Sequence, residues 1–227
     1  VYGWREPQID RLFRDLDADA FASSNGDAPA PGNHWVFLGT VYLAREQQSG
    51  ITFIADGQQR VVTGTMIYAV ARDLSADAEE RAIYHRYVAE PGGNYRLRLR
   101  DVDASFFEKW VQEPGATRRA YAPDADEPAD GDGSVAPLSE SQNNIINNRD
   151  LIIERLNALT PAARKALLDR LGQCSELVVI TATALSDATA AYASTYKRGL
   201  SQATTDRLKA ECLGDAEPNH RASLGNY

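Results

Sequence analysis

The fold of this chain is decided at residues 51–60, which read ITFIADGQQR. The apolar, β-branched run from Ile51 to Ala55 predicts a buried strand, and Asp56 with Gly57 predicts a tight turn. After Arg60, apolar residues recur about every four positions, which is typical of a helix with one apolar face. These residues are Val62, Met66, Ile67, Val70 and Leu74. We therefore expect a strand, a glycine turn and a helix in direct succession.

The polar residues of this stretch, Asp56, Gln58, Gln59 and Arg60, fall on the turn and the first helical turn. Unpaired N–H groups and the positive end of the helix dipole favour an anion there. A plain turn before a helix would need only an Asp and a Gly, and the dipole opposes a cation at this end. Because unfavourable local choices concentrate at functional sites, we favour a phosphate-binding turn over a purely structural one.

Composition places the chain among soluble globular proteins. It has 227 residues, of which 43% are hydrophobic and 25% charged, and no run approaches a membrane span. Nothing at the start resembles a signal peptide, and Cys174 and Cys212 are too few for a disulfide framework. We therefore expect a cytoplasmic, reduced protein. The net charge of −8 confines any nucleic-acid contact to local patches.

The rest of the chain predicts an α+β fold. Residues 35–43 form a strand, and the polar turn at 45–50 makes it a hairpin with 51–55. A short buried strand at 177–180 returns late and is expected to join the same sheet. Capping and periodicity signals predict helices at 7–16, 76–88, 106–111, 139–159, 161–171, 188–197 and 205–213.

Two further groups of residues have both a structural and a functional interpretation. Tyr2 and Trp4 precede the first helix, either as an apolar lid on it or as a stacking surface. The segment 95–102 alternates as a strand, with Arg96, Arg98 and Arg100 on its outer face. Such a stripe is either an ordinary solvated face or a contact for phosphates.

Residues 113–137 are rich in Pro, Gly, Ala and acid, which predicts a mobile connector between lobes 1–112 and 138–214. Its acidic residues lack the regular ligand spacing of an EF-hand, so a metal site there is disfavoured.

Several segments, in this order, resemble one known family: Trp4 with Gln8-Ile9, the strand 37–41 (FLGTV), the motif 56–60 (DGQQR), and Arg198-Gly199 followed by Asp206, Leu208 and Lys209. They are similar to the N-terminal domain shared by GmrSD-type modification-dependent restriction proteins and SspE. The chain departs from that pattern at Tyr196, where the family usually has Asn, and at Gln202, where it usually has Leu.

The resemblance implies a fold of ParB/sulfiredoxin type, with a small mixed sheet, many surrounding helices and a helical C-terminal part. It implies one domain over 1–227 that hydrolyses GTP or ATP, as a fragment of a longer protein that defends against phage. DNA cleavage would belong to a separate C-terminal HNH-type nuclease, which this sequence lacks. Asp56, Gln58, Gln59 and Arg60 would be the hydrolysis residues, with Gly57 and Lys209 as further nucleotide contacts.

No G-x-x-x-x-G-K-[ST] loop is present, so triphosphate chemistry would run through the glycine turn. Backbone N–H groups after Gly57 and the Arg60 guanidinium would hold phosphates, and Gln58 or Gln59 would position water. Asp56 would either hold Mg²⁺ or accept the proton. The alternatives are a binding module that hydrolyses nothing and a scaffold for the nuclease.

Relatives of this family respond to phosphorothioate DNA or to glucosylated hydroxymethylcytosine. A phosphorothioate sulfur is larger and less strongly hydrated than oxygen, so its reader needs apolar surface beside a cation. Tyr2 and Trp4 near Arg60 would supply that surface, with Arg96, Arg98 and Arg100 as DNA contacts. We therefore expect phosphorothioate as the DNA modification that this domain senses. The three histidines of this chain are scattered along the sequence, so we also expect no nuclease activity.

Overall fold

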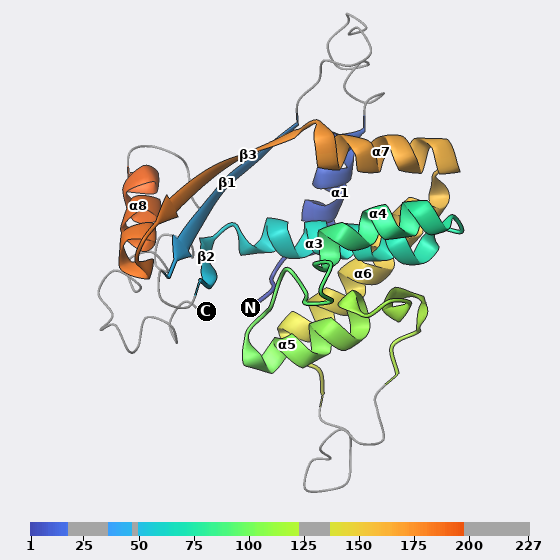
Figure 1. Ribbon diagram of the computed structural model, residues 1–227, viewed down its shortest axis with the longest axis horizontal. Coiled ribbons are helices and arrows are strands. Elements are labelled where there is room, and N and C mark those ends of the chain that lie inside the picture. The colour runs from blue at the N-terminus through green and yellow to red at the C-terminus, as the bar shows by residue number, and fades with distance from the viewer. Residues whose placement is uncertain (18–35, 47–49, 123–136, 198–227) are drawn as a thin grey trace, which may run out of the picture. The chain divides into compact units, whose positions relative to one another are not determined.

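A computed structural model of the chain describes residues 1–17, 36–46, 50–122 and 137–197 (Figure 1). The chain divides into two compact units. The sheet unit takes Val1, Phe37–Arg60 and the chain from Ser175 onward, and the helical unit takes Tyr2–Val36 and Val61–Cys174.

The sheet unit is built on three strands, β1 (Val36–Arg45), β2 (Thr52–Asp56) and β3 (Ser175–Ala182), in the order β2-β1-β3. β1 and β2 form the predicted antiparallel hairpin, with Arg45 opposite Thr52. The arrows of β1 and β3 point the same way in Figure 1, so the sheet is mixed. The α+β class with a small mixed sheet is therefore confirmed, as is the late strand that joins it.

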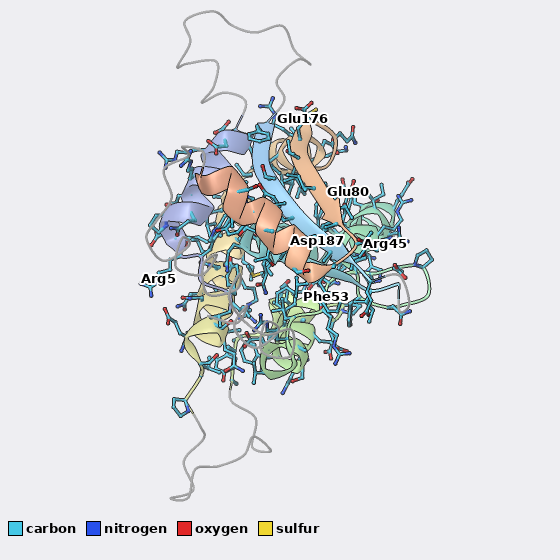
Figure 2. All side chains as sticks on the ribbon, turned by 90° about the vertical axis from the view of Figure 1, so that its left-hand side faces the viewer. Arg5, Arg45, Phe53, Glu80, Glu176 and Asp187 are labelled. Atoms are coloured by element: carbon cyan, nitrogen blue, oxygen red, sulfur yellow. The ribbon has the colours of Figure 1, made fainter. Side chains whose placement is uncertain are left out.

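α8 (Leu185–Lys197) covers one face of this sheet and packs against β2 and β3. Figure 2 looks onto α8 as it lies across the strands. The contact centres on two buried rings, Tyr42 of β1 and Tyr192 of α8, which meet edge to face with centroids 5.6 Å apart. Ala55 and Ile180 pack against this pair. This small apolar core holds β2 just before the glycine turn.

The burial predicted for the two outer strands is wrong. The sequence predicts buried strands at 51–55 and 177–180, yet Phe53 is 45% exposed and Val179 is 53% exposed. β2 and β3 are the outer strands of the described sheet, so each has a neighbouring strand on only one side. An apolar, β-branched run identifies a strand correctly, but it does not report how many neighbours that strand will have.

α3 (Gln58–Leu74) starts directly after Gly57, as predicted, and most of its length belongs to the helical unit. Its predicted apolar face is buried except for Leu74, which is half-buried, and Met66 has no exposed surface. The helix differs from the prediction because every residue from Thr65 to Asp73 is buried, rather than one face alone. A helix buried all round must satisfy its polar side chains internally.

Most of the remaining described helices lie where the sequence predicts them, but α5 (Asp101–Phe107) starts earlier than the helix predicted at 106–111, and the helix predicted at 205–213 lies outside the described residues. Ser139 and Thr160 cap two of them, accepting hydrogen bonds from the amides of Gln142 at 3.1 Å and Ala163 at 3.2 Å. Among the described helices, none is long and apolar enough to cross a membrane. Their bounds are α1 Glu6–Leu16, α4 Ala78–Val88, α5 Asp101–Phe107 with a π-helical continuation Glu108–Gln112, a 3₁₀ turn Ala116–Arg118, α6 Glu140–Ala158 and α7 Pro161–Gln173.

Residues 95–102 do not form the predicted strand. Tyr95 makes one isolated bridge, to Ala89, and α5 begins at Asp101, inside this range. The alternation itself is right, because the buried residues are Leu97 and Leu99 and the exposed ones Arg96 and Arg98. A side chain takes the place of a partner strand here, since Gln112 Nε2 donates to the carbonyl of Leu97 at 2.8 Å.

The connector predicted over 113–137 begins later than the sequence indicates. Residues 113–122 are described, and the amides of Gly115 and Thr117 donate to the buried Asp73 carboxylate at 2.9 and 3.1 Å. Those hydrogen bonds fix a segment whose composition alone favours mobility. Residues 123–136, with most of the acidic cluster, lie outside the described residues.

The two compact units do not coincide with the expected lobes 1–112 and 138–214. The sheet unit combines early and late segments because β3 adds to β1 after a long helical excursion. Composition marks where a chain is polar and open, whereas strand pairing joins residues that are distant in sequence.

Candidate functional site

The centre of the candidate site is the turn between β2 and α3. Asp56 ends β2, Gly57 adopts φ +90°, and Gln58 starts α3. A Cβ on Gly57 would lie 2.8 Å from Val41 Cγ2 and 3.2 Å from the carbonyl oxygen of Thr40. Glycine is therefore required both for the backbone angle and for the close approach to β1.

Replacing Gly57 with alanine is expected to destabilise the protein more than the same change at Gly50. Gly50 also has a left-handed backbone, at φ +70°, but nothing lies within 4 Å of an added Cβ. Comparing the two variants therefore separates backbone strain from crowding. The crowding at Gly57 should lower the free energy of unfolding by about a further 1–3 kcal/mol. Urea unfolding of both variants measures the difference, and equal midpoints would show that the turn relaxes away from β1.

Arg60 reaches from the first turn of α3 back to β1. Its Nη1 donates to the carbonyl oxygen of Thr40 at 3.2 Å. The guanidinium lies over Gly39, where an added Cβ would come within 3.1–3.2 Å of it. Within the described part of the chain, Nε and Nη2 of this half-buried side chain make no hydrogen bond. Arg60 is therefore held in place with part of its donor fork available to an anion.

The two glutamines of the turn are not equivalent. Gln59 Nε2 donates to the carbonyl of Val1 at 2.9 Å. The half-buried side chain of Gln58 makes no hydrogen bond among the described residues. Gln59 therefore anchors the start of the chain, whereas the amide of Gln58 is available to a ligand or water.

Asp56 is half-buried at the end of β2, opposite Tyr42 in the strand register. Across the described ranges no group of three or more His, Cys, Asp or Glu side chains is arranged to hold a metal ion. Mg²⁺ is commonly bound through one or two carboxylates together with substrate phosphates and water. A magnesium ion at this turn would therefore arrive with a nucleotide and would take Asp56 as a protein ligand.

Residues 1–213 match the family model described as the N-terminal domain of the GmrSD restriction endonuclease. The chain belongs to this family. The match spans the glycine turn and most of both units, which confirms the resemblance stated from the sequence. The family implies an anti-phage restriction protein that acts on DNA with a C-terminal nuclease domain. No match is found among curated proteins.

In this GmrSD-type domain, Tyr2 does not offer the accessible stacking surface expected of it. It is 1% exposed, and its hydroxyl hydrogen-bonds with Thr63 Oγ1 at 2.8 Å and Asn148 Nδ2 at 3.0 Å. Burial raises the pKa of Tyr2 to about 12. Tyr2 is therefore a buried structural residue with partners on α3 and α6, and its role as a lid on the first helix stays a prediction. Trp4 is half-buried, and its sensing role stays a prediction.

The three arginines of the basic stripe have different environments. Arg96 Nε donates to the carbonyl of Arg86 at 2.6 Å, and Arg98 is exposed. Arg100 is half-buried, its Nη1 is buried without a hydrogen-bond partner among the described residues, and burial lowers its pKa. A uniform basic face is absent from this described segment, and DNA contact by any of the three stays a prediction. Lys209 and the rest of the late motif lie outside the described residues.

Sequence reasoning missed Gly39 and Thr40 as parts of the site. One signal was available, because a glycine inside a strand often marks a close approach of another group. Gly39 lies in the segment 37–41 that carries the family resemblance. The contact between its backbone and the Arg60 guanidinium gives that glycine a physical reason.

Proposed function

We propose that the turn Asp56–Arg60 hydrolyses a nucleoside triphosphate, GTP or ATP, and that hydrolysis controls restriction of modified DNA. The observation that carries this proposal is the Arg60 guanidinium, which is fixed on β1 by Thr40 while part of its donor fork stays available. A fixed cation in the first turn of a helix can stabilise the charge that develops on a transferring phosphoryl group.

Catalysis would depend on positioning and charge. The amide of Arg60 donates to the carbonyl of Gly57 at 3.1 Å, so the amide of Gln58, at the start of the first turn of α3, would be the one to donate to phosphate oxygens. Arg60 would stabilise the charge that spreads over the transferred phosphoryl group. Because these donors are in place before the substrate binds, little reorganisation is needed during the reaction.

Gln58 would orient the attacking water, since its amide is available whereas Gln59 is hydrogen-bonded to Val1. Asp56 would accept the proton of that water or hold Mg²⁺, whose chemistry when bound is to neutralise the phosphate oxygens. Each residue of the turn then has a separate task.

We propose phosphorothioate as the mark that this domain senses. Tyr2 is buried, but Phe37 is 63% exposed and lies on β1 two residues before Gly39. Phe37 therefore lies on the same strand as Gly39, whose backbone contacts the Arg60 guanidinium. An exposed ring on this strand, together with that cation, would suit a weakly hydrated sulfur better than a sugar, which needs many hydrogen-bonding groups.

Phosphate release by the purified chain tests this function. We expect Mg²⁺-dependent turnover of GTP or ATP that increases with a phosphorothioate duplex and not with matched plain or glucosylated duplexes. We also expect no cleavage of any duplex by this chain, because the chemistry of DNA cleavage belongs to the family's nuclease domain. Nucleotide binding without turnover would favour a binding module, and no binding at all would favour a scaffold. Equal stimulation by all three duplexes would remove phosphorothioate sensing alone.

A further inference from the structure

A pocket separate from the glycine turn lies wholly within the helical unit, between the end of α3, the helix α4 and the segment 114–118. Its volume is about 370 Å³. Its polar lining consists of Arg72, Asp73, Arg81, His85, Gly115 and Arg118. We propose that this pocket binds the phosphate group of a nucleotide or nucleic acid. This inference is independent of hydrolysis at the glycine turn, because no residue is shared between the two sites.

The carboxylate in the pocket would not repel an anion, because it is fully engaged. Asp73 forms a buried ion pair with Arg72, with Nε donating to Oδ1 at 2.7 Å. It also accepts from the amide of Gly115 at 2.9 Å and from the amide and hydroxyl of Thr117 at 3.1 and 2.8 Å. Arg72 and Asp73 therefore cancel in charge, and the remaining cations set the sign of the pocket.

Those remaining cations are Arg81 and Arg118. Arg81 is exposed, and its Nη1 donates to the carbonyls of Ser75 at 3.2 Å and Ala76 at 2.8 Å. Arg118 donates through Nε to the carbonyl of Asp73. Over the described ranges neither forms an ion pair with a carboxylate, and each keeps free guanidinium N–H groups. Guanidinium forks bind phosphate oxygens in pairs, and their charge persists at all relevant pH values.

His85 adds an imidazole nitrogen that has no hydrogen-bond partner among the described residues. Its Nδ1 is buried and makes no hydrogen bond among the described residues, and it lies one helical turn after Arg81 on α4. Burial, with the nearby Arg72 charge, lowers the pKa of His85. A buried polar atom without a partner costs free energy, and a phosphate oxygen accepting from Nδ1–H would remove that cost.

The size and setting of the pocket fit such a ligand. A volume of about 370 Å³ lies at the lower end of small-molecule sites, which suits a phosphate with part of a sugar. The chain has a net charge of −8, so a pocket whose uncompensated side chains are arginines differs in sign from the chain as a whole. The pocket thus combines positive charge, a hydrogen-bond donor and enough volume for a phosphate group.

Titration of the chain with inorganic phosphate and pyrophosphate, followed through the imidazole NMR signals of His85, tests the proposal. We expect a saturable shift of these signals together with a rise in the pKa of His85, because a bound anion stabilises the imidazolium. The signals are assigned with His85→Gln. If the His85 signals do not shift at phosphate concentrations on the order of tens of millimolar, the proposal is wrong.

The variant Arg81→Gln/Arg118→Gln should weaken phosphate binding by roughly tenfold or more, because each loss removes a charge-assisted contact. Arg86→Gln is the matched control, since Arg86 is exposed on the same helix but does not line the pocket. If the double variant does not fold, Arg81→Gln alone should weaken binding several-fold, because this side chain is exposed. Equal affinity in the variant and the control would contradict the proposal.

Competition identifies the source of the phosphate. A plain DNA duplex that displaces phosphate from wild type, but not from Arg81→Gln, assigns the pocket to nucleic acid. Displacement by GDP or ADP under the same conditions assigns it to a nucleotide. If inorganic phosphate binds but neither competitor displaces it, the proposed ligand class is wrong.

Discussion

Arg60→Ala is expected to abolish triphosphate hydrolysis while leaving the fold intact. The side chain is half-buried and makes one hydrogen bond among the described residues, to Thr40 at 3.2 Å, so its loss should change stability by only about 1 kcal/mol. An arginine that stabilises transferring phosphoryl charge is worth roughly 10³–10⁵ in turnover. Steady-state phosphate release, with thermal unfolding measured on the same samples, separates the two effects.

Two further variants sharpen this test. Arg45→Ala removes an exposed cation at the far end of β1 (Figure 2) and should leave turnover unchanged. Arg60→Lys keeps the charge but not the planar fork, so it should recover only part of the activity. Normal turnover in a folded Arg60→Ala protein would refute the proposed mechanism. Loss of folding would instead favour a structural role for the turn.

The glycine turn could be predicted because its signals are local. A strand, an Asp-Gly pair and a helix with regular apolar spacing follow one another, and the structure places them in that order. The position of the Arg60 guanidinium could not be read in the same way, because it depends on how closely α3 approaches Gly39 of β1. That approach follows from the hairpin register, and spacing along one segment does not report it.

Long-range contacts explain the expectations that were wrong. Tyr2 lies near the chain start, where an aromatic residue is commonly exposed, but partners on α3 and α6 hold it in the interior. The strand expected at 95–102 has the right alternation and no strand beside it in the described structure. In both cases the sequence identifies the residues correctly as apolar or alternating. It does not show which element packs against them.

Asp73→Asn is expected to lower the free energy of unfolding by about 3–5 kcal/mol, because it leaves Arg72 as a buried charge without its counterion. The side chains of this pair are only 4% and 3% exposed. An asparagine amide would also direct N–H groups at donors, since the amides of Gly115 and Thr117 and the Arg72 guanidinium all point at this carboxylate. The segment 113–118 should therefore detach from α3 as well, which hydrogen exchange at these amides would detect.

The pH dependence of stability identifies the cause. Burial alone would raise the pKa of Asp73, but hydrogen bonds from Arg72 and Gly115, with the Arg72 charge, outweigh it and hold the pKa below its ordinary value. Its stabilising effect is therefore fully present above the unfolded-state pKa of about 3.9, and it is lost as the pH falls through the lower folded-state value. The difference in free energy of unfolding between wild type and Asp73→Asn should be constant near neutral pH and should shrink below about pH 4. Asp169→Asn, which breaks an exposed pair with Lys165, should leave the free energy of unfolding almost unchanged. A difference between wild type and Asp73→Asn that did not change with pH would show that lost packing, and not the buried charge, destabilises the variant.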